Sequence, residues 1–135
     1  MKNTFQIPDN LETDVQSLKQ KLEIKGYSSF NLENKFNGYQ YLLDLMDTNY
    51  DGTFDEYIND LASREILEEI IPEMSLELKT FAKKILEGMD SKFILLSEES
   101  VKMQKFAERR NISNDFMWYY RVPKKIKAIF REDFI

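Results

Sequence analysis

Residues 53–70, TFDEYINDLASREILEEI, show a clear helical pattern within this chain of 135 residues. Their apolar side chains recur at steps of three and four residues, which places them on one face of an α-helix. Thr53 and Glu56 have the spacing of a capping box, in which two side chains satisfy free backbone N–H groups at a helix start. The stretch therefore predicts a long amphipathic helix that begins at Thr53.

The same spacing of apolar residues extends over most of the chain. There are only four Gly and three Pro, so helices joined by short loops are expected. Residues 93–96 are compatible with a strand or a helix, and helix is favoured because no partner strand is visible. The other predicted helices run from Asp9, with Glu12 in a capping box, to Gly26, from Leu32 to Phe36, from Gly38 to Met46, from Ser75 to about Gly88, from Ser97 to about Arg110, and from Ser113 onward, with a break at Pro123.

The length and composition are those of one folded domain. Hydrophobic residues make up 42% of the chain, and ten Phe, seven Tyr and one Trp supply enough apolar surface for a core. We therefore predict a single helical domain over residues 1–135, an all-α, compact bundle of six to eight helices. No stretch approaches the roughly 20 apolar residues that span a bilayer, and the first residues lack the apolar run of a signal peptide. A cytoplasmic protein without membrane contact is expected.

The chain contains neither Cys nor His. Thiol nucleophiles, Ser-His-Asp triads, His general bases and zinc sites built on Cys or His are therefore excluded. Carboxylate, Lys, Arg, Tyr and Ser chemistry remains, but no motif places a nucleophile beside a base. The sequence predicts a protein that is not an enzyme and that has no cofactor.

The formal net charge of −5 hides a strong asymmetry along the chain. From Asp44 to Glu77, eleven acidic residues are accompanied only by Arg64, which gives −10. From Val101 to the end, nine basic residues face four acidic ones, which gives +5. Two interpretations stay open: the segments pack together or are simply solvated, or the acidic segment creates a field that attracts a basic partner.

The second interpretation predicts a non-enzymatic protein-binding module with an acidic helical surface. Immunity or antitoxin proteins that neutralise a basic, nuclease-type toxin fit this description, because surface carboxylates can occupy a groove that binds phosphates. Tyr50 or Tyr57 would serve as exposed aromatic anchors. The residues predicted for the partner-binding surface are Asp51, Asp55, Asp60, Glu65, Glu68 and Glu69.

Residues 47–55 resemble the first nine positions of an EF-hand calcium loop. The resemblance implies calcium binding as an alternative function, with Gly52 at the sharp turn. It departs from the family at the twelfth position, where Ile58 replaces the bidentate Glu, and tight turns select the same Asn, Asp and Gly residues. The candidate ligands are Asp47, Asn49, Asp51 and Asp55.

Residues 116–127 interleave aromatic and basic side chains. Bases can stack on aromatic rings while cations contact phosphates, so this segment is a candidate nucleic-acid site. However, the sequence pI is about 4.9, no recognised nucleic-acid-binding motif is present, and the acidic segment would repel a polyanion. We therefore expect most of these aromatics in the core and a protein partner rather than nucleic acid. The basic residues concerned are Arg121, Lys124, Lys125 and Lys127.

Overall fold

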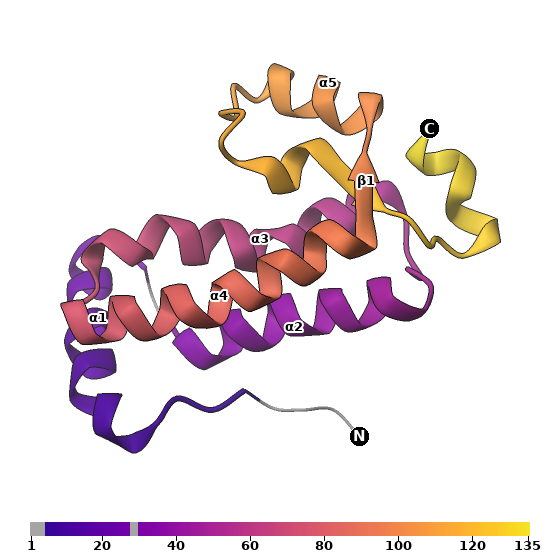
Figure 1. The fold of residues 1–135 in the computed structure, drawn as a ribbon. Helices are drawn as coiled ribbons and strands as arrows, with labels where there is room; N and C mark the ends of the chain where they lie inside the picture. Colours follow the sequence, from indigo (N-terminus) through magenta and orange to yellow (C-terminus); the bar gives the residue numbers. More distant parts are fainter. Residues whose placement is uncertain (1–4, 28–29) are drawn as a thin grey trace.

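The structure is a computed structural model that describes residues 5–27 and 30–135. Three long helices run side by side and enclose most of the core (Figure 1). They are α2 (Leu32–Thr48), α3 (Phe54–Ile70) and α4 (Leu76–Leu96). The all-α fold class predicted from the sequence is confirmed.

Shorter elements cover the two ends of this three-helix layer (Figure 1). One end is crossed by α1 (Glu12–Ile24), which follows the 3-10 turn η1 (Asp9–Leu11). The other end carries α5 (Val101–Arg109) and a two-stranded antiparallel ribbon, in which Glu98 lies opposite Val122. The remaining elements are η2 (Ile71–Glu73), β1 (Ser97–Glu99), η3 (Met117–Tyr120), β2 (Arg121–Pro123) and η4 (Ala128–Phe134).

Of the two predicted capping boxes, one is confirmed and one is wrong. At the start of α3, Thr53 Oγ1 accepts from Glu56 N at 3.1 Å, and Glu56 Oε1 accepts from Thr53 N at 3.0 Å. At Asp9 no side chain caps the helix, because residues 9–11 form a 3-10 turn before α1 begins. Gly26 has a φ of 101° just beyond the end of α1, a conformation that glycine adopts without strain.

The helix predicted to begin at Gly38 instead belongs to the longer α2. Asn31 caps this helix, since its Oδ1 accepts from Asn34 N at 3.1 Å. Gly38 lies inside α2, where a Cβ atom would lie 2.4 Å from Ser63 Oγ of α3. Gly38 therefore allows α2 and α3 to approach closely and does not break the helix.

The boundaries predicted for the second half of the chain need correction. α4 continues past Gly88 to Leu96, so residues 93–96 are helical as favoured; buried Phe93 anchors that last turn. Ser97 opens a strand, and Ser100 caps α5 by accepting from Met103 N at 3.2 Å. The aromatic helix predicted after Ser113 is replaced by η3 and β2, because pairing with β1 holds that segment extended.

The C-terminal segment docks on the start of α3 through an aromatic cluster. Phe134 is buried, and its ring centroid lies 6.0 Å from Tyr50, 5.7 Å from Phe54 and 5.8 Å from Tyr57. Asp133 Oδ2 accepts from Phe54 N at 2.6 Å, so a carboxylate of η4 satisfies a free amide at the start of α3. Among the described residues, no helix is both long and apolar enough to cross a bilayer.

Replacing Phe134 with alanine should destabilise the fold by about 3 kcal/mol, because it leaves a cavity between three aromatic rings. Urea unfolding followed by circular dichroism measures this loss. The matched control is Ile129→Ala in the same segment, whose side chain is exposed and whose removal should change stability by less than about 0.5 kcal/mol. Equal losses for both variants would contradict the proposed docking of Phe134.

Candidate functional site

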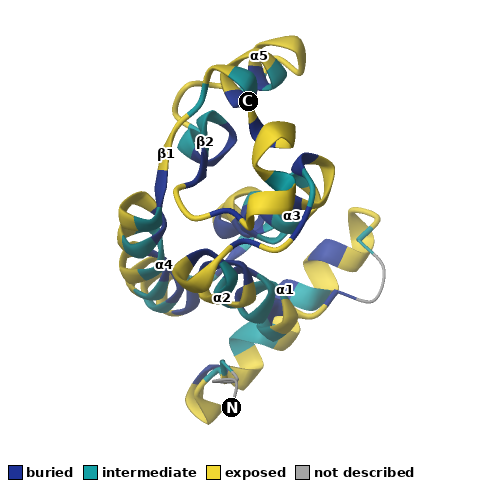
Figure 2. Ribbon diagram, turned by 90° about the vertical axis from the view of Figure 1, so that its right-hand side faces the viewer, coloured by how far each residue is buried: buried dark blue, intermediate teal, exposed yellow. Residues whose placement is uncertain are grey.

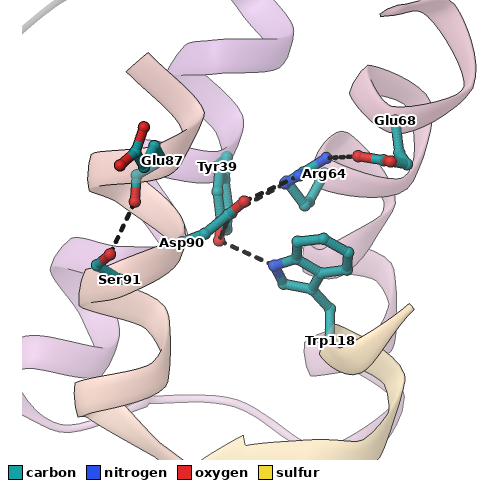
Figure 3. Close-up of polar contacts among 7 residues, drawn as sticks. All are labelled: Tyr39, Arg64, Glu68, Glu87, Asp90, Ser91 and Trp118. Atoms are coloured by element: carbon teal, nitrogen blue, oxygen red, sulfur yellow. Dashed lines mark hydrogen bonds and ion pairs between the residues drawn. The ribbon is translucent and has the colours of Figure 1, made fainter. Parts of the chain in front are cut away.

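Arg64, the one basic residue of the acidic segment, is buried at the centre of a polar network (Figure 3). Only 3% of its surface is exposed. Its Nε and Nη2 donate to the two carboxylate oxygens of Asp90 at 3.0 and 2.9 Å, and Nη1 donates to Glu68 at 2.9 Å. The guanidinium carbon lies 4.0 Å from the ring centroid of Trp118. Arg64 thus links α3 to α4 and to η3.

Two more hydrogen bonds close this network. Tyr39 donates its hydroxyl to Asp90 Oδ1 at 2.7 Å, and Trp118 Nε1 donates to the Tyr39 hydroxyl at 3.1 Å. Burial opposes the charge on Arg64, but the hydrogen bonds and charges of Asp90 and Glu68 outweigh it, and the pKa of Arg64 is raised. Because each of the three guanidinium nitrogens donates to a carboxylate, the buried charge is well compensated. The side chain of Glu68 is therefore held in place by a buried residue, Arg64.

Three other acidic residues of α3 accept hydrogen bonds from tyrosine hydroxyls. Tyr50 donates to Asp60 at 2.5 Å, Tyr119 donates to Glu65 at 2.9 Å, and Tyr27 donates to Glu69 at 3.2 Å. The three acceptors are Asp60, Glu65 and Glu69. A tyrosine hydroxyl is neutral at physiological pH, so it fixes a carboxylate in place without removing its negative charge.

The tyrosine donors stay protonated for identifiable physical reasons. Burial raises the pKa of both Tyr50 and Tyr119, and the hydrogen bonds to their carboxylates add to this effect. For Tyr27, the charge of Glu69 is the main cause that raises the pKa of the hydroxyl. These carboxylates are therefore held by neutral donors rather than by cations.

The six residues predicted for partner binding do not form one continuous group. Glu65, Glu68 and Glu69 lie together on the C-terminal half of α3, and we call them the α3 acidic patch. Asp55 lies about 20 Å away along the helix axis, given a rise of about 1.5 Å per residue. Asp51 precedes the helix, and its carboxylate lies 3.5 Å from Lys127 Nζ.

Asp60 and the predicted aromatic anchors have structural roles. Asp60 is half-buried and bound to Tyr50, and burial raises the pKa of its carboxyl group. Tyr50 and Tyr57 are almost completely buried, so the prediction that they are exposed anchors is wrong. Tyr57 instead donates to the carbonyl oxygen of Arg121 at 2.9 Å. Both rings belong to the cluster around Phe134.

The loop that resembles an EF-hand is engaged by the basic C-terminal segment. Tyr50 N donates to the Lys125 carbonyl at 2.8 Å, and Lys127 N donates to the Tyr50 carbonyl at 2.9 Å. Asp47 lies 3.7 Å from Lys92 Nζ, and Asn49 is exposed. Within the described part of the chain, no three acidic residues gather in a group suited to a metal ion. The structure therefore adds no support to the calcium alternative.

The aromatic residues that follow Ser113 pack mainly into the core, as predicted. Trp118 and Tyr119 are buried. The guanidinium of Arg121 donates to Ser97 Oγ at 2.8 Å and to the Ser97 carbonyl at 3.0 Å, so this cation stabilises the ribbon. The acidic and basic segments therefore pack against each other, at the loop after α2 through Lys125 and Lys127 and along α3 through Tyr119.

Sequence reasoning did not identify Arg64 as a central residue. A signal was present, because Arg64 lies seven residues after Tyr57 and three after Leu61, on the face of α3 that is otherwise apolar. The tyrosine donors left no such signal. Tyr27 and Tyr119 are far from their acceptors in the sequence, and only the fold brings them together.

Replacing Asp90 with alanine should destabilise the protein by about 3 kcal/mol, because it leaves a buried guanidinium without its main partner. Chemical denaturation measures the loss. Glu68→Ala is the matched control, since it removes the other carboxylate on the same arginine. The Glu68 side chain is 46% exposed, and its removal should cost less than about 1 kcal/mol. A larger loss for Glu68→Ala than for Asp90→Ala would contradict this description of the network.

Replacing Asp60 with asparagine should make stability less sensitive to pH. Burial raises the pKa of Asp60 in the folded state, because it disfavours the charged carboxylate. Protonated Asp60 therefore contributes stability at low pH, and this contribution is lost as the pH rises through the pKa of the folded state. Asparagine still accepts from Tyr50 but does not ionise, so the variant should gain stability relative to the wild type between about pH 4 and pH 7. Urea midpoints at both pH values test this, and Asp55→Asn, on exposed surface, should show no such gain.

In comparisons with known proteins, no protein-family model, no curated protein and no solved structure matches this chain. Its function must therefore be inferred from its own residues and their contacts.

Proposed function

We propose that the chain is a non-enzymatic protein-binding module that docks on a basic partner through the α3 acidic patch. In this proposal it acts in the cytoplasm as an immunity or antitoxin protein that neutralises a nuclease-type toxin. The observation that supports it most directly is that Glu65 and Glu69 are held by tyrosine hydroxyls and Glu68 by a buried arginine. The patch is therefore both charged and ordered before any partner binds.

Preorganisation favours binding because association must otherwise immobilise flexible side chains. Each long side chain ordered at an interface costs about 0.5–1.5 kcal/mol. The intramolecular hydrogen bonds of the patch already restrict these side chains, so less conformational entropy is lost when a partner binds. Each carboxylate also retains oxygen lone pairs beyond those used by its donor, so it can accept a further hydrogen bond from a partner.

The electrostatic field of α3 suits a cationic partner. The helix carries six acidic residues and only Arg64 as a base, and Arg64 is turned inward toward Asp90. Such a surface speeds the encounter with a basic protein and repels acidic ones. A nuclease that binds phosphates presents clustered cations, and carboxylates placed there would block its substrate. The proposed function is therefore inhibition by occupying the phosphate-binding surface.

The test removes the charges of the patch while keeping the size of its side chains. The triple variant Glu65→Gln, Glu68→Gln, Glu69→Gln should lose about tenfold or more in affinity at low ionic strength and show a weaker salt dependence. The probe is a purified basic nuclease domain of a bacterial toxin, whose cations bind phosphates. Calorimetry at two salt concentrations measures binding, and cleavage of a nucleic-acid substrate measures inhibition.

A matched control removes the same number of charges from another part of the surface. Asp9, Glu12 and Glu23 are exposed residues in and beside α1, and Asp9→Asn, Glu12→Gln, Glu23→Gln should leave affinity almost unchanged. Equal losses in the two variants would mean that only net charge matters. Unchanged affinity in the patch variant would refute the proposed interface.

A further inference from the structure

The outward face of α4 exposes large apolar side chains at both ends of the helix. Leu76 near its start is 75% exposed, and Ile94 and Leu95 at its end are 46% and 71% exposed. Figure 2 shows exposed residues along the outer side of α4, which no other element of residues 5–27 and 30–135 covers. These apolar groups are not needed for the core of the single chain.

Four residues on this face form one straight stripe. Leu76, Lys83, Glu87 and Ile94 follow one another at intervals of seven, four and seven residues. On a helix with about 3.6 residues per turn, these intervals keep all four within about 40° of a single line. Lys83 and Glu87 are one turn apart, yet neither charged group forms an ion pair with any residue that the structure describes.

The side chains of the stripe are complementary to those of a second stripe that runs in the opposite direction. Leu76 and Ile94 lie equally far from Ile85, on opposite sides of it, and so do Lys83 and Glu87. If a second α4 packs antiparallel with its midpoint at Ile85, Leu76 faces Ile94 of the second copy. Lys83 then faces Glu87 of the second copy, and two-fold symmetry makes each contact twice.

The residues between the stripe positions permit close approach of a second helix. Thr80 and Ser91 turn their hydroxyls back to the carbonyls of Leu76 and Glu87, at 2.8 and 2.9 Å. Short side chains beside the stripe suit close packing between helices.

We propose that the chain forms an antiparallel homodimer through the outward face of α4, with a second copy of this chain as the occupant. One helix pair buries less than the roughly 1,200–2,000 Å² of a stable interface, so the dimer is reversible and depends on concentration. The face belongs to α4, whereas the acidic patch belongs to α3. The dimer and the proposed binding of a basic partner can therefore fail independently.

Sedimentation equilibrium from about 10 µM to about 1 mM tests the dimer. The wild type should shift from monomer toward dimer as concentration rises. Lys83→Glu places two acidic residues opposite two acidic residues, and Glu87→Lys places basic residues opposite basic ones, so each variant alone should remain monomeric. Mixing the two variants should restore a dimer, because each Glu then faces a Lys of the other chain.

Control variants carry the same charge reversals away from this face. Lys105→Glu on α5 and Glu23→Lys on α1 change exposed residues, and both should dimerise like the wild type. Circular dichroism checks that all variants keep their helical content. A wild type that stays monomeric over the whole range would overturn the proposal. So would a mixture that stays monomeric, or controls that lose the dimer as fully as the stripe variants.

Discussion

The buried ion pair between Arg64 and Asp90 is the interaction on which the rest of the structure depends. It joins two of the three long helices, since Arg64 belongs to α3 and Asp90 to α4. Tyr39 of α2 and Trp118 of η3 complete the network, so four elements meet at one carboxylate and one guanidinium. A buried pair of this kind adds little net stability relative to apolar packing. It does specify which helix faces meet, because either charge alone would be costly to bury.

This constraint also shapes the electrostatics of the surface. With Arg64 turned inward, α3 presents its carboxylates without a cation on its own exposed face. Tyrosine hydroxyls replace cations as donors to Asp60, Glu65 and Glu69. The C-terminal segment brings Lys125 and Lys127 to the loop before α3, and Lys25 at the end of α1 pairs with Glu73 just beyond the end of the helix. Cations from other elements therefore form ion pairs with Asp51 and Glu73, which flank α3.

The helical fold was largely predictable, and the errors have local physical causes. Periodicity and the capping box at Thr53 identified α3 correctly, because both depend on neighbours within one or two turns. Gly38 and Gly88 were taken as boundaries, but each lies inside a helix whose packing outweighs the small cost of glycine. The ribbon between residues 97–99 and 121–123 escaped prediction because each strand is three residues long and pairs with a distant partner.

By itself, the sequence determined the helical class, the start and course of α3, the absence of Cys and His chemistry, and the separation of acidic and basic segments. These features depend on composition and on local spacing. Only the tertiary structure decided which partner each carboxylate has. Asp60 became a partner of Tyr50, and Asp51 a partner of Lys127, while Glu65, Glu68 and Glu69 stayed together at one end of α3. Apart from Arg64, which holds Glu68, the partners of these carboxylates lie outside α3. Helical spacing predicts contacts only within one helix, so it could not identify them.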